Sequence, residues 1–341
     1  MFRAVQLLAE RSTLEVAPFV SSWIVAVNDL DRGAPRIGTL HRFFENLVRS
    51  ASGEPFRVSM AEAELRSFIE AHLPGSGRGT VFAQTAQHMI TALRRIVWIT
   101  DPNTVEYLSP ILRLLDAQRR LVIVTLNCDN TIELMAAHHG IDCITGIDEW
   151  SRGATFYLDG DGLYLLKLHG SINWELVSNQ TSEGRPMPHS VIRRRSFEEM
   201  SSSREDLEKA HTEAWRRQDY EELSRISALL QRFEYPPTVI FGGRNKLTAE
   251  GPYLDLLRAF REELSQISLL TVIGYSFRGP HVNEYLTRWL NVDPGNRMRV
   301  INGKEFWNRP TEYAQLLKER VPDRVEEIRC HAGEALKGLW T

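Results

Sequence analysis

The sequence predicts an α/β fold: a Rossmann-like, mostly parallel sheet with helices on both faces, plus an inserted helical module. From about residue 96, apolar segments of strand length alternate with segments whose apolar residues recur every three or four positions. This alternation stops at residue 177 and resumes after residue 236. Several of the apolar runs end abruptly in small or polar residues, which is where an open α/β sheet places its ligands.

The composition is that of an ordinary globular protein. The chain has 341 residues, 43% hydrophobic and 25% charged, which is enough for one large domain or two lobes. A net charge of -3 gives no overall attraction to phosphate backbones, so we expect no direct contact with nucleic acid. The three cysteines form no C-x-x-C pair, which argues against a disulfide framework and against a paired-cysteine zinc site. No apolar run approaches the roughly 20 residues that span a bilayer, so we expect a cytoplasmic protein without membrane contact.

Residues 1–95 are expected to be mostly helical and to complete the main domain. Segments 41–51 and 62–73 place apolar residues three and four apart, and the Gly- and Pro-containing segment 74–80 interrupts the pattern. The apolar segment 22–27 is a candidate for an early strand.

Residues 96–176 form the first part of the predicted Rossmann-like core. The expected order is a strand at 96–100, a helix at 107–120, a strand at 121–126 and a helix at 131–140 that Gly140 closes. Such alternation favours parallel strands joined by crossover helices. Segment 155–170 predicts two strands joined as a hairpin across Asp159–Gly162, because Asp-Gly pairs between apolar runs are typical of tight turns. The second of these strands leads to His169.

Residues 177–236 predict an inserted helical module, and residues 237–341 predict the second part of the core. The insertion begins with polar and turn-forming residues, contains three consecutive arginines at 193–195, and continues as charged, helix-like sequence to about residue 233. We expect its amphipathic helices to pack against the main sheet or against another subunit. After it, the expected elements are a strand at 238–243, a helix at 252–264, a strand at 268–276, a helix at 281–291, a strand at 298–302, a helix at 311–320 and a strand near 325–330.

Two polar residues follow the strand that is expected at 121–126. Asp129 or Asn130 can cap the helix that begins at Thr131, and local propensity alone favours this structural role. The functional interpretation is that Asn127 holds a ribose or a water molecule, and that Asp129 accepts from an amide or a hydroxyl group. Local sequence leaves both interpretations open.

Three further strand ends carry candidate ligand-binding residues. His169 precedes Gly170, whose missing side chain lets a ligand come close to the imidazole. Gly274 and Ser276 offer backbone N–H groups and a hydroxyl to a phosphate or a ribose. Asn302 is able to hydrogen-bond both hydroxyls of a ribose, although a turn asparagine is the simpler interpretation of it alone. Together these residues predict one ligand site at the edge of the sheet.

Four short motifs follow one another along these strand ends: Thr125–Asp129 (TLNCD), Leu168–Ser171 (LHGS), Gly274–Ser276 (GYS) and Ile301–Asn302 (IN). In their order and placement they resemble the sirtuin superfamily, and in particular its bacterial NAD-hydrolysing branch found in antiphage defence. The resemblance covers residues 96–302. It implies a Rossmann-like fold, NAD as the substrate and chemistry that requires no metal.

The resemblance also implies a role for each matching residue. His169 would be the base that activates a ribose hydroxyl or water, and Asn127 would orient the nicotinamide ribose and the attacking water. The residues implied to bind the dinucleotide are Thr125, Asp129, Gly274, Tyr275, Ser276 and Asn302. Relatives act with translocase-type ATPases or Argonaute-type proteins, so the resemblance implies such a partner and a homo-oligomer.

The sequence departs from the family pattern at three places. The four zinc-binding cysteines of the deacylases are missing, which disfavours deacylation. The glycine loop that follows the first strand has only Gly33 and Gly38 as poorly matching candidates, and Gly279 stands where an acidic residue is expected. Two hypotheses therefore stay open: an NAD hydrolase that forms nicotinamide and ADP-ribose, and a noncatalytic module that binds NAD or ADP-ribose or scaffolds a complex. A third is a nucleic-acid-associated subunit that uses Arg193–Arg195.

Overall fold

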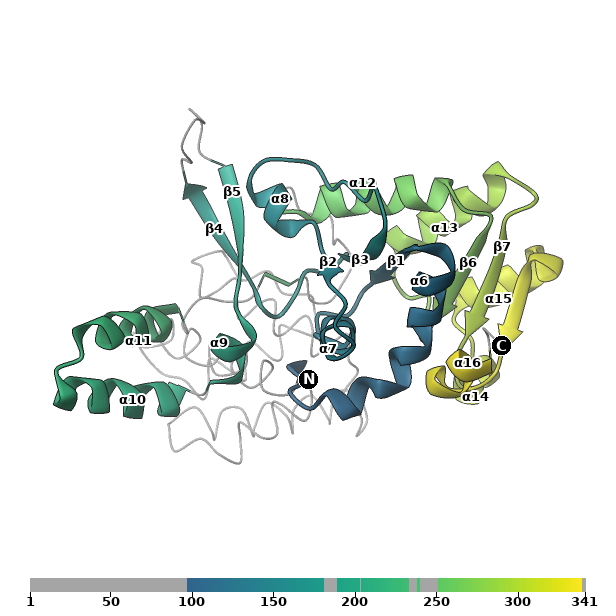
Figure 1. The fold of residues 1–341 in the computed structure, drawn as a ribbon. Helices are drawn as coiled ribbons and strands as arrows, with labels where there is room; N and C mark the ends of the chain where they lie inside the picture. Colours follow the sequence, from purple (N-terminus) through teal and green to yellow (C-terminus); the bar gives the residue numbers. More distant parts are fainter. Residues whose placement is uncertain (1–96, 181–188, 203, 233–237, 240–250, 339–341) are drawn as a thin grey trace, which may run out of the picture. The chain divides into compact units, whose positions relative to one another are not determined.

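The computed structural model describes residues 97–180, 189–202, 204–232, 238–239 and 251–338 (Figure 1). The elements expected within residues 1–95 lie outside these ranges, and so do Gly33, Gly38 and most of the strand expected at 238–243. The chain divides into two compact units. The larger described part, with residues 99–170 and 251–338, carries the α/β core, and the other carries the helical module.

The first sheet of the core has three parallel strands in the order β1-β3-β2. They are β1 (Arg120–Thr125), β2 (Cys143–Ile144) and β3 (Gly162–Lys167). The central strand β3 is buried along almost its whole length, whereas the residues of β1 are half-buried. A continuous apolar run is typical of a strand that neighbours cover on both edges and both faces.

Helices cover this sheet and share one apolar core with it. The helices are η1 (Pro102–Ile111), α6 (Leu112–Gln118), α7 (Thr131–His138) and, from the end of the chain, α16 (Ala332–Gly338). A further short helix, α8 (Ile147–Ser151), follows β2. Met135 of α7, Leu163 of β3 and Leu336 of α16 are fully buried in the same cluster. Because α7 connects two parallel strands, the crossover expected between them is confirmed.

The second sheet is also parallel, in the order β6-β7-β8. Its strands are β6 (Leu269–Ile273), β7 (Arg297–Ile301) and β8 (Val325–Ile328). The accompanying helices are α12 (Tyr253–Ser265), α13 (Pro280–Val292), α14 (Lys304–Asn308), α15 (Glu312–Arg320) and η2 (Pro322–Arg324). An ion pair of 2.7 Å between Arg120 and Glu263 joins α12 to β1. The predicted α/β fold with parallel strands is confirmed, with its strands divided between two sheets.

The prediction of a strand at 96–100 is wrong for the residues described, because Val97–Thr100 contain no strand. The buried side chain of Asn130 takes the place of a neighbouring strand there. Its Oδ1 accepts from the Ile99 N–H at 2.8 Å, and its Nδ2 donates to the Ile99 carbonyl at 2.9 Å. A side-chain amide thus satisfies both backbone groups of one residue.

The prediction of a hairpin across Asp159–Gly162 is also wrong. Residues 155–159 form no strand, although Phe156 and Leu158 are buried. The reason is that β1 and β2 occupy both edges of β3, so no edge remains for an antiparallel neighbour. The apolar side chains of 155–159 contribute to packing without joining the sheet.

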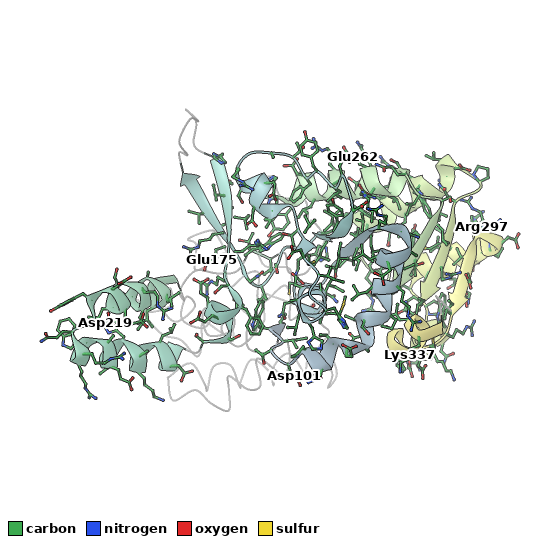
Figure 2. All side chains as sticks on the ribbon, viewed as in Figure 1. Asp101, Glu175, Asp219, Glu262, Arg297 and Lys337 are labelled. Atoms are coloured by element: carbon green, nitrogen blue, oxygen red, sulfur yellow. The ribbon has the colours of Figure 1, made fainter. Side chains whose placement is uncertain are left out.

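The inserted helical module is confirmed for residues 197–202 and 204–232. It consists of α9 (Phe197–Ser201), α10 (Arg204–Arg217) and α11 (Tyr220–Arg232), and α10 and α11 pack through Leu207, Ala214, Leu223 and Ile226. Asp219, at the turn between these two helices (Figure 2), accepts from the Glu222 N–H at 3.1 Å and so caps α11. Ahead of these helices, β4 (Trp174–Gln180) and β5 (His189–Arg194) form a two-stranded sheet that the pattern does not predict. No helix among the described residues is both long and apolar enough to cross a bilayer.

Candidate functional site

The ends of β1 and β3 hold the first group of candidate residues. Thr125 is the register partner of Lys167, and the Leu168 N–H donates to the Thr125 carbonyl at 3.0 Å. This bond extends the pairing beyond the strands, so the segments that follow them run side by side. As a result His169 lies against the TLNCD motif, and its Nδ1 is 3.1 Å from the Leu126 carbonyl oxygen.

Asn127 is exposed immediately after β1. Its backbone N–H donates to the Thr125 hydroxyl oxygen at 3.1 Å, which stabilises the turn after the strand. The Thr125 hydroxyl therefore has a structural contact of its own, while the Asn127 side chain is presented at the surface. Their roles in ligand binding stay predictions.

Asp129 has a structural role at the start of α7. Its Oδ1 accepts from the N–H of Thr131, the first residue of that helix, at 3.1 Å and from the Thr131 hydroxyl at 2.6 Å. The N-cap residue itself is Asn130, whose side chain makes no capping bond. The carbonyl oxygen of Asp129 accepts from the ammonium of Lys167. The Asp129 carboxylate is thus engaged before any ligand is bound.

Lys167 is a buried charge that sequence reasoning missed. Its side chain is fully buried at the end of β3, and its Nζ lies 2.6 Å from Glu133 of α7. The available signal is a single lysine at the end of an otherwise apolar strand, because a buried lysine requires an acidic partner. Burial raises the pKa of the neighbouring Cys128 thiol, and the charge of Lys167 opposes this only in part. Cys128 is therefore protonated at neutral pH and is not a nucleophile.

His169 is held between two partners. The side chain lies in a buried residue, which is only 8% exposed. Because the Leu126 carbonyl oxygen can only accept a hydrogen bond, Nδ1 of His169 carries the hydrogen in that contact. Its Nε2 lies 3.3 Å from the Nε2 of His281 in the first turn of α13. Sequence reasoning missed His281. The signal that was present is a histidine at the second position of a helix, five residues beyond Ser276.

The second group of candidate residues lies where β6 and β7 end. The Gly274 N–H donates to the Ile301 carbonyl at 2.9 Å, and Gly274 has a φ of 68°, a conformation that glycine adopts without strain. The Asn302 side chain donates to the Tyr275 carbonyl at 2.9 Å. The GYS and IN motifs therefore lie together, as the parallel register predicts.

The Tyr275 side chain organises the loop between β6 and α13. Its hydroxyl lies 3.1 Å from the Gly279 nitrogen, from which it accepts, and 2.9 Å from Oδ1 of Asn283. Burial raises the pKa of Tyr275 to about 12. Ser276 is exposed in this loop, and its carbonyl accepts from the Thr311 hydroxyl at 3.0 Å.

The contact between His169 and His281 joins the two groups. One group contains the turn at Asn127 together with His169, and the other contains Gly274, Tyr275 and Asn302. Since His281 belongs to the helix that follows the GYS loop, this contact links the end of β3 to that loop. The structure thus connects all four motifs through contacts between neighbouring residues.

Two residues of the basic run at 193–195, Arg193 and Arg195, take part in internal ion pairs, whereas Arg194 is exposed. Arg193 and Arg195 both bind the carboxylate of Glu175, which is labelled in Figure 2. Glu175 and Arg195 are only 2% and 5% exposed. Burial lowers the pKa of Arg195, and the charge of Glu175 opposes that shift. Side chains buried in this way are poor candidates for contacts with phosphate backbones.

Searches for related proteins add no assignment. No protein-family model matches the chain, and no curated protein matches it significantly. Among the described residues, no group of three or more His, Cys, Asp or Glu side chains is arranged to hold a metal ion. Functional inference therefore depends on the residues at the strand ends.

Proposed function

We propose that the protein is an NAD hydrolase that cleaves the bond between nicotinamide and ribose, with water, to give nicotinamide and ADP-ribose. The observation that carries the proposal is the environment of His169. Its Nδ1–H is bound by a backbone carbonyl, which leaves the lone pair of a neutral imidazole on Nε2. Exposed Asn127 lies one residue beyond that carbonyl.

These two side chains suit the chemistry of the reaction. As nicotinamide leaves, positive charge develops on the ribose, so the protein mainly has to position the dinucleotide and stabilise that charge. Nε2 of His169 would take a proton from a ribose hydroxyl or from the attacking water. The amide of Asn127 would orient the ribose and the water. This chemistry requires no metal.

The second group of residues would bind the rest of the dinucleotide. A Cβ built on Gly274 would meet no described atom within 4 Å, so a phosphate would have access to the backbone there. Asn302 donates its Nδ2 to the protein, so it would offer Oδ1 to the hydroxyls of a ribose. Thr125, Tyr275 and Ser276 complete the proposed binding residues.

The resemblance to the sirtuin superfamily also supports a biological role. On this basis we propose an antiphage effector that depletes cytoplasmic NAD, acts as a homo-oligomer, and has an ATPase or an Argonaute-type protein as a partner. Uncontrolled loss of NAD would kill the cell, so the activity would depend on assembly or on a trigger.

The alternative is a noncatalytic module that binds NAD or ADP-ribose or scaffolds a complex. One observation favours it. The resemblance implies that the Asp129 carboxylate holds the carboxamide of nicotinamide, but Oδ1 of Asp129 already accepts from the N–H and the hydroxyl of Thr131. Binding the carboxamide through that oxygen would cost these two hydrogen bonds at the start of α7.

Measuring nicotinamide release from NAD tests the proposal. We expect wild-type protein to release nicotinamide, and we expect His169→Ala and Asn127→Ala each to lose activity by about a hundredfold or more. The matched control is His211→Ala, because His211 is located in α10 of the helical module. A wild type that binds ADP-ribose in a calorimeter but releases no nicotinamide in any assembly state would leave only the binding module.

A further inference from the structure

A second histidine lies against the atom of His169 that the proposed function uses. The Nε2 atoms of His169 and His281 are 3.3 Å apart, and their rings are tilted by 43°. Because the Leu126 carbonyl fixes the hydrogen of neutral His169 on Nδ1, Nε2 of His169 has only a lone pair. The hydrogen in the contact between the rings must then come from His281.

The start of α13 fixes the position of His281. This histidine is the second residue of α13, a helix of 13 residues. The next residues, Val282 and Asn283, are buried, and Asn283 donates to the Phe277 carbonyl at 2.8 Å. The start of α13 is therefore anchored to the GYS loop, which fixes where His281 can reach.

We propose that His281 is a positioning residue for His169, an inference that rests on the proposed function. Its Nε2–H holds the imidazole of His169 in one orientation, while the Leu126 carbonyl fixes the tautomer. The lone pair on Nε2 of His169 has a single direction in the ring plane, so it accepts from one donor at a time. On binding, a hydroxyl of the nicotinamide ribose or the attacking water takes the place of His281 and donates its proton to Nε2.

Two substitutions of nearly equal size separate hydrogen bonding from packing. His281→Gln keeps an N–H donor at a similar distance from the backbone, whereas His281→Met keeps the length and has no donor. We expect His281→Met to lower kcat for NAD hydrolysis about tenfold or more, with KM nearly unchanged, because a misaligned base slows the chemical step. His281→Gln should recover most of the loss. Equal kcat values in the two variants would overturn the proposal.

Imidazole ¹⁵N spectra of histidine-labelled protein give a test that does not depend on turnover. We expect His169, assigned by comparison with His169→Ala, to carry its hydrogen on Nδ1 in both wild type and His281→Met, because the Leu126 carbonyl is present in both. Its Nε2 resonance should shift in His281→Met, because that lone pair loses its donor. Adding ADP-ribose should shift the Nε2 resonance of His281, because a ribose hydroxyl then replaces His281 as the donor to Nε2 of His169. If this shift of the His169 Nε2 resonance in His281→Met appears in a protein that does not hydrolyse NAD, the proposed function fails and the contact stands. If the protein hydrolyses NAD while His169 is unchanged in His281→Met, the role of His281 fails.

Discussion

The ammonium group of Lys167 lies 2.6 Å from the Glu133 carboxylate, and it also binds the Asp129 carbonyl. Lys167 ends the central strand β3, two residues before His169. Glu133 belongs to the first turn of α7, and Asp129 lies two residues before that helix. The pair therefore connects the strand that presents His169 to the helix that follows Asn127. The ion pair that stabilises this part of the core therefore also helps to hold the strand of His169 against α7.

Removing the carboxylate should destabilise the protein. Glu133→Gln leaves the fully buried Lys167 without its counter-charge. We expect the free energy of unfolding to fall by about 2–3 kcal/mol, less than for a wholly buried pair because Glu133 is 28% exposed. Urea unfolding followed by far-UV circular dichroism measures this change.

The surface pair of Arg152 and Glu149 provides the matched control, since both side chains are more than half exposed. Glu149→Gln should change stability by less than about 0.5 kcal/mol. The double variant Lys167→Met with Glu133→Leu should be more stable than Glu133→Gln, because no charge is left buried. If Glu133→Gln and Glu149→Gln have equal effects, the buried pair does not stabilise the core.

Tyr275 should make the protein sensitive to alkaline pH. Burial raises its pKa from 10 to about 12, so above pH 10 the unfolded chain loses this proton more readily than the folded one. The contribution of the protonated Tyr275 hydroxyl to the free energy of unfolding is complete below pH 10 and is lost as the pH rises towards 12. Tyr275→Phe should therefore show a smaller loss of stability between pH 10 and 12 than wild type, as measured by urea unfolding at several pH values.

Part of the sensitivity should persist in Tyr275→Phe, because burial also raises the pKa of Tyr253 and of Tyr313. Tyr157→Phe is the control, since Tyr157 is 70% exposed. If the pH profiles of Tyr275→Phe and wild type coincide, the Tyr275 hydroxyl does not contribute to the alkaline transition.

Much of the fold could be predicted from the sequence because apolar periodicity records burial. The segments predicted for α7, α12, α13, α15 and β8 match the observed elements to within a few residues at each end. The errors at 96–100 and 155–159 have a common cause: both segments are apolar, but their place in a sheet depends on distant partners. The Asn130 side chain binds the backbone of Ile99 where a neighbouring strand would otherwise pair with it. Strands β1 and β2 occupy both edges of β3, so segment 155–159 has no edge to pair with.

The candidate site was less predictable, because its contacts join segments far apart in the sequence. Strand ends with polar residues point to Asn127, His169, Gly274 and Asn302, and the parallel registers bring them together in pairs. No local pattern indicates that His281 meets His169, which is 112 residues away. Their contact depends on how α13 begins, and that depends on the loop that Tyr275 organises.

The glycine at position 279, where the family pattern has an acidic residue, has a physical explanation. A Cβ on Gly279 would lie 2.8 Å from the Tyr275 hydroxyl oxygen, which accepts from the Gly279 N–H. The Tyr275 ring cannot move away freely, because its centre is 4.8 Å from that of buried Phe277. The hydroxyl thus occupies the space that a side chain at position 279 would need.

Gly279 and Tyr275 should therefore be coupled in a double-mutant cycle. With a φ of -92°, Gly279 has no backbone strain to relieve, so the cost of Gly279→Ala comes from the clash, and we expect about 1–2 kcal/mol. In the Tyr275→Phe background the oxygen is gone and the nearest of the other neighbours is 3.5 Å away, so the same substitution should cost little. It would even gain slightly from restricting the unfolded chain. Urea unfolding of the four proteins measures the coupling, and strictly additive effects would show that the hydroxyl does not exclude a side chain at position 279.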